Sequence, residues 1–183
     1  YNKPKTGLDV RLFTGGFIYN GDQTENQLFH ISACTGEQDY LVDEIYFGRS
    51  EYQGWLSQQT VMNDGAMKVR TDYTIGMGET NKWLLSTNLR STLPFKSPLF
   101  LFADAGVYAG TNADLYGRFM FDGGAGISLF AHTIEVYLPL VFSQNIRTNQ
   151  LTYPEYDQWF EHLMFTVNIT RLNPFNLIRQ INL

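Results

Sequence analysis

The sequence predicts an all-β fold, and three features of the chain support this prediction. Apolar and polar residues alternate with a period of two along almost all of its 183 residues, as in strands with one covered face. No window of a dozen residues carries the 3.6-residue period of an amphipathic helix. Short connections at 93–98 and 129–132 alternate with long, polar ones at 63–80 and 143–157, which favours an antiparallel up-and-down arrangement.

The composition narrows the class of protein further. A hydrophobic fraction of 44%, an aromatic fraction of 15% and a charged fraction of 17% are typical of a folded chain. With 13 Lys and Arg against 18 Asp and Glu, the chain lacks the basic excess of a nucleic-acid-binding protein. No apolar run approaches the roughly 20 residues of a membrane-spanning helix, and Cys34 is the only cysteine. We expect one domain over residues 1–183, or the C-terminal part of one.

We expect about eight strands, each defined by its own stretch of alternation. Their expected ranges are 7–19, 27–36, about 54–62, 81–93, 98–109, 117–129, 132–142 and 158–171. The span 37–53 has no clear pattern. Polar segments rich in Asn, Gln, Thr and Gly separate the strands, and no repeat or linker marks a second domain.

The two faces of the later strands differ in polarity. In 81–93 apolar positions alternate with Asn88 and Arg90, whereas in 98–109 both faces are partly apolar and one carries Asp104. The apolar positions of the last three strands are Phe119, Phe121, Ile134, Val136, Leu138, Leu163, Phe165, Val167 and Ile169. The polar positions expected in the barrel interior are Arg11 of the first strand and Asn88, Arg90, Asp104, Arg118, Asp122, Glu135 and Asn168 of the later strands.

The residue types on the polar face indicate which way it points. Arginines and carboxylates occur in mid-strand beside small residues such as Gly106, Gly124 and Gly126, and lysine is nearly absent from the strands. The solvent-facing side of a soluble sheet usually carries long, Lys-rich side chains, whereas a narrow barrel interior needs paired charges and little bulk. We therefore predict an antiparallel up-and-down transmembrane β-barrel, with its polar face inside and its apolar face toward lipid.

Aromatic residues at the ends of the strands support the same prediction. Trp83 and Trp159 open strands that follow long connections, while Phe95, Phe130 and Phe175 lie at tight turns or near the end of the chain. Outer-membrane barrels carry aromatic girdles at both water interfaces, with long outer loops and short periplasmic turns. The expected location is the bacterial outer membrane, with its lipid as the main partner.

No motif in the chain predicts a reaction or a metal site. The run Asp122-Gly-Gly-Ala-Gly126 is followed by more strand and not by the helix that a phosphate-binding loop requires. The histidines His30, His132 and His162 do not form a His-Glu-x-x-His pair, and Cys34 has no basic neighbour in sequence.

Other sites carry a structural interpretation as well as a functional one. Asp104, Asp122 and Glu135 are candidates for acid–base chemistry, although ion pairing with the interior arginines is favoured. Asn168-Ile-Thr170 matches a glycosylation sequon, but it falls inside an expected strand.

Several stretches, taken in their order along the chain, resemble a known family. The main ones are Gly7-Leu-Asp-Val-Arg-Leu-Phe13, then Phe47-Gly-Arg49 leading to Leu56-Ser-Gln-Gln59, and Leu172-Asn-Pro-Phe175. Shorter ones are Leu-Pro-Phe-Lys at 93–96, Ala-Asp-Ala-Gly at 103–106 and Val-Tyr-Leu-Pro-Leu at 136–140. Together they resemble the C-terminal membrane-barrel region attached to some metallopeptidases of the membrane alanyl aminopeptidase type in one branch of Gram-negative bacteria.

The resemblance implies a function for this segment that involves no reaction of its own. In that family a zinc-dependent gluzincin domain precedes the barrel and supplies the His-Glu-x-x-His helix with a downstream Glu ligand. None of these positions exists in this chain, so no catalytic or metal-binding residue is carried over, and zinc would belong to the preceding domain. The segment would anchor that domain, and further strands would complete the barrel.

Two other interpretations of the alternation stay open at this point. A soluble lipocalin-like barrel produces the same pattern with its apolar set lining a cavity for a small apolar ligand. A small pore is the other, although eight strands leave an interior that side chains fill, so that a pore requires additional strands.

Overall fold

The computed structural model describes residues 7–18, 28–34, 45–47, 54–71, 76–94, 97–130, 132–151 and 159–168. Within these ranges the chain is mostly antiparallel β-structure with a few short helices, which confirms the predicted fold class at this level. Eight strands are described, six in one sheet and two in a smaller one.

The main sheet has the strand order β1-β4-β5-β6-β7-β8, and every neighbouring pair is antiparallel. Its strands are β1 (Leu8–Gly16), β4 (Trp83–Thr92), β5 (Leu99–Tyr108), β6 (Phe119–Leu129), β7 (Ile134–Phe142) and β8 (Met164–Val167). The smaller sheet pairs β2 (Phe29–His30) with β3 (Glu79–Thr80). The main sheet is thus an up-and-down meander interrupted once, between β1 and β4.

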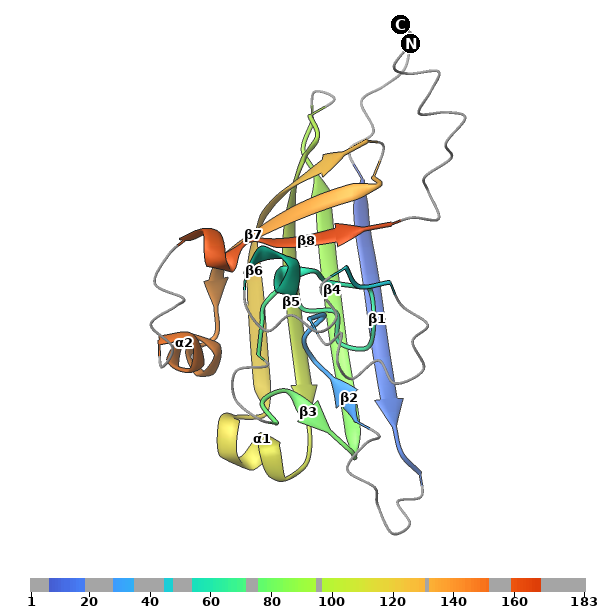
Figure 1. Cartoon of the computed structure of the whole chain (residues 1–183). Helices are drawn as coiled ribbons and strands as arrows, with labels where there is room; N and C mark the ends of the chain where they lie inside the picture. Colours follow the sequence, from blue (N-terminus) through green and yellow to red (C-terminus); the bar gives the residue numbers. More distant parts are fainter. Residues whose placement is uncertain are drawn as a thin grey trace, which may run out of the picture.

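The sheet curls into a half-barrel, with β7 and β8 bending round in front of the straighter strands β4 and β5 (Figure 1). Two short helices connect strands at its sides. Helix α1 (Thr111–Tyr116) joins β5 to β6, and α2 (Gln144–Leu151) follows β7. Two 3₁₀ turns, η2 (Trp55–Gln58) and η4 (Trp159–His162), lie near β8.

The hollow of the half-barrel is filled by chain that runs between β1 and β4. We call residues 28–34 and 61–71 the plug, because most of them are buried and their backbone runs in front of the curled sheet (Figure 1). Its two parts bind each other through backbone hydrogen bonds from Ala33 N to Met67 O (2.9 Å) and from Met67 N to Ile31 O (3.0 Å). The plug therefore supplies its own partners for backbone groups that the sheet does not reach.

An apolar core joins the plug to one end of the sheet. Ile31 and Met67 of the plug pack with Leu84 of β4, Tyr108 of β5 and Met120 of β6, and all five side chains are inaccessible to solvent. Burial of this apolar surface is the main driving force that holds the plug inside the curl.

A second apolar cluster lies at the other end of the concave face. Phe100 and Phe102 of β5 contact the ring of Tyr137 of β7 edge-on, with ring centroids 5.3 and 5.4 Å apart. Met164 of β8 and the thiol of Cys34 complete this cluster. A polar layer separates the two apolar clusters.

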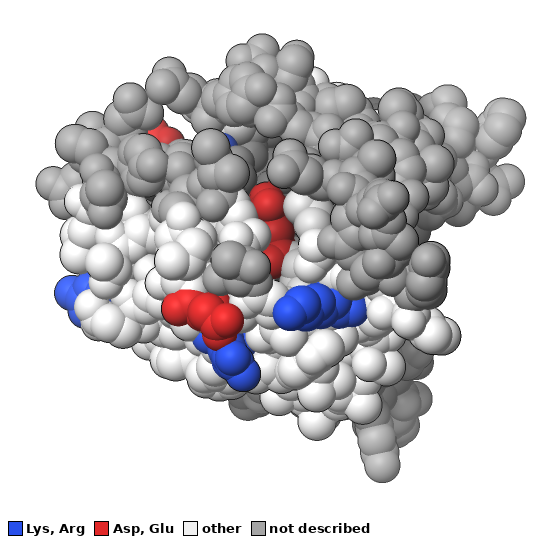
Figure 2. All heavy atoms as spheres, turned by 90° about the horizontal axis from the view of Figure 1, so that it is seen from below, with Lys and Arg blue, Asp and Glu red and all other residues white. Residues whose placement is uncertain are grey.

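The convex face of the sheet is apolar and exposed. Residues on this face are in register from strand to strand, for example Val10, Leu89 and Ala103 across β1, β4 and β5. The large exposed apolar side chains of the convex face are Leu8, Val10, Leu12, Trp83, Leu85, Leu89, Leu99, Leu101, Phe119, Phe121, Leu129 and Val141. Seen from below, most of the described surface is likewise uncharged (Figure 2).

Several predicted elements need correction. The predicted strand at 54–62 is the 3₁₀ turn η2 followed by a single parallel bridge from Gln59 to Phe165, since Gly54 has a positive φ of 75° and turns the chain. The predicted strand at 158–171 begins with η4 and pairs only over Met164–Val167 among the described residues. The connections expected at 63–80 and 143–157 contain the buried plug and helix α2.

The interior glycines are sites of close approach and not of open space. A Cβ at Gly106 would lie 2.7 Å from Ile31 Cδ1, and one at Gly126 would lie 2.3 Å from the Phe100 ring. At Gly124 a Cβ would lie 2.0 Å from the Leu138 carbonyl oxygen, beside the β-bulge at 123–124. The small residues thus let the plug and the aromatic rings reach the sheet.

Replacement of Gly65 tests the fit of the plug. A Cβ at this position would lie 2.5 Å from both Cα and O of Ile31, where only backbone movement can relieve the clash. We expect Gly65→Ala to lower the free energy of unfolding by about 1–3 kcal/mol, measured by urea titration of the refolded chain. Gly16→Ala is the control, because its Cβ would meet nothing closer than 3.6 Å. Equal stability of the two variants would contradict a tightly fitted plug.

Candidate functional site: a buried polar layer inside the half-barrel

Three polar residues lie side by side across the middle of the concave face. Asn88 of β4 is in register with Asp104 of β5, which is in register with Asp122 of β6. All three are almost completely buried, at 7%, 2% and 2% exposure. Two carboxylates directly opposite each other repel, so this layer requires compensating donors.

The plug supplies the cation of this layer. Lys68 is 4% exposed, and its Nζ lies 3.2 Å from Asp104 Oδ2. Nζ also donates to the carbonyl oxygen of Ala66, and the backbone N–H of Lys68 donates to Asp122 Oδ2 at 3.2 Å. One plug residue therefore reaches both carboxylates, by its charge and by its main chain.

Asn88 and Arg11 extend the network toward β1. The Asn88 amide donates to Asp104 Oδ1 (3.0 Å) and to the Gly65 carbonyl (2.9 Å). Its own oxygen accepts from Arg11, which also donates to the Asp64 carbonyl at 2.7 Å. The sheet and the plug are thus tied together by charge-assisted hydrogen bonds, which are among the stronger ones in proteins.

A second polar cluster lies toward the β6–β7 turn. Arg90 donates to Glu135 Oε1 at 2.8 Å, and the Tyr137 hydroxyl donates to Glu135 Oε2 at 2.7 Å. The guanidinium carbon of Arg90 also lies 4.2 Å from the centroid of the Phe100 ring, a cation–π contact. His132 Nδ1 lies 3.1 Å from Glu135 Oε1.

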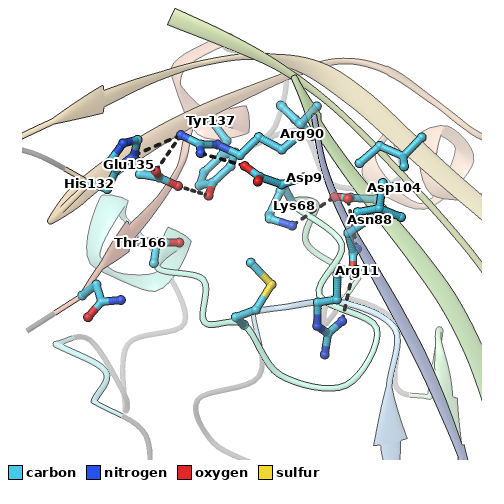
Figure 3. A pocket seen from close by; sticks show the side chains of 15 residues that line it. Asp9, Arg11, Lys68, Asn88, Arg90, Asp104, His132, Glu135, Tyr137 and Thr166 are labelled. Atoms are coloured by element: carbon cyan, nitrogen blue, oxygen red, sulfur yellow. Dashed lines mark hydrogen bonds and ion pairs between the residues drawn. The ribbon is translucent and has the colours of Figure 1, made fainter. Parts of the chain in front are cut away.

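A cavity of about 530 Å³ lies between the two clusters. Arg90, His132 and Glu135 line one side of it, and Lys68 and Asp104 line the opposite side (Figure 3). The cavity is therefore bordered by charged and hydrogen-bonding groups that already engage one another.

The predicted interior residues occupy different environments. Arg11, Asn88, Arg90, Asp104, Asp122 and Glu135 lie on the concave face, and Asn168 borders the cavity. Arg118 is the exception, because it precedes β6 and its side chain is 69% exposed, where it pairs with Asp114 at 2.7 Å. Its position at the rim lets the guanidinium reach α1, so its placement in the interior was wrong.

The apolar set predicted to face lipid lies on the side opposite the polar layer. Phe119 and Phe121 of β6 are exposed on the convex face, and Ile134, Val136, Leu138, Phe165 and Val167 share that face by register. Leu163 directly precedes β8, and Ile169 is outside the described residues.

The predicted girdle residues are described in part. Trp83 is 47% exposed at the start of β4, and Phe130 is 62% exposed in the β6–β7 turn. Trp159 is 68% exposed but belongs to η4 and does not open a strand. Phe95 and Phe175 lie outside the described residues.

Lys68 is the main site residue that the sequence analysis missed. It lies in a segment interpreted as a polar loop, although the run Met67-Lys68-Val69-Arg70 alternates as a covered strand does. Tyr137 and His132, which both contact the predicted interior residue Glu135, were also not assigned to the interior network.

The contacts of His132 do not form a serine–histidine–acid relay. Ser128 Oγ and Glu135 Oε1 both contact the same nitrogen of His132, Nδ1, at 2.8 and 3.1 Å. A serine–histidine–acid relay uses the two ring nitrogens for different partners. Among the residues that the structure describes, no three His, Cys, Asp or Glu side chains form a group able to hold a metal ion.

Burial also fixes the charge state of the plug histidine. It lowers the pKa of His30 to about 4, because the imidazolium would lose its hydration inside the curl. His30 is therefore neutral at pH 7, and its backbone N–H donates to Asp64 Oδ2 at 3.0 Å. Burial raises the pKa of Asp64.

Comparison with protein-family models, with curated proteins and with solved structures finds no match for this chain. Within the described ranges, no helix combines the length and the apolar character needed to cross a membrane.

Removal of the Lys68 charge tests the polar layer. We expect Lys68→Met to lower the free energy of unfolding by about 3–5 kcal/mol, because Asp104 would keep a buried charge without its ion-pair partner. Asp104→Asn in the same chain should recover part of the loss. Urea titration of both variants measures the effect, with Lys82→Met, at an exposed lysine, as the control. Similar midpoints for Lys68→Met and Lys82→Met would show that the ion pair contributes nothing.

Proposed function

We propose that this chain is an outer-membrane β-barrel anchor of a Gram-negative bacterium that tethers a zinc aminopeptidase-like domain preceding it. The observation that carries the proposal is the inverted distribution of polarity. Polar side chains of the central strands, Asn88, Asp104 and Asp122, are buried on the concave face, and large apolar side chains are exposed on the convex face.

This distribution of polar and apolar side chains fits a lipid environment better than an aqueous one. Side chains such as Leu12 and Leu101 are 75% and 49% exposed, and the exposed Leu89 of β4 lies diagonally opposite both of them. Each fully exposed leucine forgoes about 1.5–3 kcal/mol that burial would provide. A continuous apolar face of this kind marks a contact with another apolar phase, and in an outer-membrane barrel that phase is lipid.

The concave face argues against the two alternatives. A lipocalin-like barrel would turn its apolar set toward an internal cavity, whereas the cavity here is bordered by Arg90, Glu135, Lys68 and Asp104. An open pore would need an empty lumen, whereas the plug occupies the hollow. A plugged barrel provides attachment to the membrane without conduction.

The tethering part of the proposal rests on the family resemblance. In the motif Leu56-Ser-Gln-Gln59, both glutamine side chains form hydrogen bonds to the backbone of other segments. Gln59 Nε2 donates to the Ile45 carbonyl at 2.6 Å, and Gln59 Oε1 accepts from Phe47 N at 2.7 Å. Gln58 Nε2 donates to the carbonyl oxygens of Phe160 and Glu161. These contacts join two of the resembling stretches to the segment that precedes β8.

A charge on the convex face tests the proposal. We expect Leu101→Arg to cost about 2–4 kcal/mol of stability in a bilayer, because the guanidinium would enter hydrocarbon. The same change on the surface of a water-soluble sheet costs within about 0.5 kcal/mol. Urea unfolding of the chain refolded into phospholipid vesicles measures the difference.

Leu115→Arg is the matched control for this measurement. Leu115 is 70% exposed on α1, outside the sheet, so that its arginine stays in water. Equal, small effects of the two arginines would contradict the membrane assignment.

A further inference from the structure

An apolar groove lies on the outer side of the last two strands. It has a volume of about 660 Å³. Its floor includes Val136 of β7 and Phe165 of β8, and its walls include Trp55 and Leu56 of η2 and Phe160 of η4. The polar cavity on the inner side of the sheet is a separate space with different lining residues.

Among the described residues that line the groove, Gln58 is the one amide side chain, and its nitrogen is already hydrogen-bonded within the protein. Gln58 is 3% exposed, and its amide nitrogen already donates to the Phe160 and Glu161 carbonyl oxygens, at 3.2 and 2.8 Å. The remaining lining is aliphatic, aromatic or thioether. An occupant with polar groups would lose their hydration without replacement, so the groove selects hydrocarbon.

The wall formed by η2 is held firmly against β8. The ring centroids of Trp55 and Phe165 are 5.4 Å apart, and the backbone N–H of Thr60 donates to the Phe165 carbonyl at 2.7 Å. Ser57 Oγ donates to the Gly54 carbonyl at 2.6 Å, which closes the turn. The groove is therefore formed before an occupant arrives, which lowers the entropic cost of binding.

The groove continues the apolar convex face of the sheet. Leu99, Ile127, Val136 and Phe165 are partners in register across β5, β6, β7 and β8. This row leads from the exposed face of β5 directly into the groove floor. Whatever apolar phase covers the convex face thus has direct access to the groove.

We infer that the groove binds one acyl chain of a membrane lipid. The inference rests on the proposed membrane location and adds to it a specific lipid site, distinct from general contact with the bilayer. A hydrocarbon chain matches a groove that is lined almost entirely by apolar side chains and whose floor continues the convex face. A bound chain would join η2 and η4 to the sheet at the strand that ends the described half-barrel.

Native mass spectrometry of the full chain tests this inference. The chain is refolded in phosphatidylcholine vesicles and extracted into mild detergent, and the retained lipid is counted for each protein. We expect one retained phosphatidylcholine for the unmodified chain. Val136→Phe, which places a phenyl ring in the groove, should lower the retained fraction about tenfold. Leu101→Phe, on the convex face outside the groove, should leave it unchanged.

A second readout separates this inference from the proposed function. Trp83 of β4 is exposed opposite Gly16 of β1 and does not line the groove. In the variant Trp55→Phe/Trp159→Phe it is the single tryptophan, since the sequence has three. We expect its fluorescence to be quenched in vesicles of phosphatidylcholine brominated on its acyl chains.

Each outcome supports or overturns one of the two claims. Quenching of Trp83 without lipid retention, or with equal retention in both phenylalanine variants, overturns the groove and leaves the membrane location standing. Retention that Val136→Phe abolishes, without quenching of Trp83, supports the groove and overturns the membrane location. A lipid-free dimer that Val136→Phe dissociates would show that a second copy of the chain is the occupant and would overturn the inference.

Discussion

The ion pair between Lys68 and Asp104 is the interaction on which the rest of the fold depends. Asp104 and Asp122 are in register on neighbouring strands. Burial of two adjacent carboxylates is unfavourable unless a cation pairs with them, and Lys68 of the plug is that cation. Lys68 meets this requirement with its side chain and, through its backbone, also binds Asp122. The charge layer therefore determines where the plug lies along the strands, while the apolar contacts of Ile31 and Met67 determine how closely it packs.

This constraint also explains why polarity is distributed as it is. Once the polar side chains of β4, β5 and β6 are neutralised inside the curl, the alternation of a strand places the apolar side chains outside. The same pleat thus produces a buried charge network and an exposed apolar face. Such a face is unfavourable in water and favourable in lipid, so the interior pairing and the proposed membrane location follow from one pattern.

The sequence predicted the parts of the fold that depend on period-two alternation. β4, β5, β6 and β7 lie within the predicted ranges, and most interior polar residues share the concave face. The plug was missed because its conformation depends on contacts between residues distant in sequence, such as the close approach of Gly65 to the backbone of Ile31. Helix α2 was missed because only Ile146, Asn149 and Gln150 of its eight residues are buried, which gives no apolar period. Arg118 was misplaced because alternation does not show where a strand ends.

The most direct test of the central claim is whether the chain folds without an apolar phase. Residues 1–183 are refolded in plain buffer and in detergent micelles, and circular dichroism and the heat-modifiable mobility of the chain on gels are compared. The account predicts a folded β-spectrum and a heat-dependent mobility shift in micelles only, because the convex face requires hydrocarbon. A monodisperse, folded protein in plain buffer would contradict the membrane location and favour a soluble β-domain.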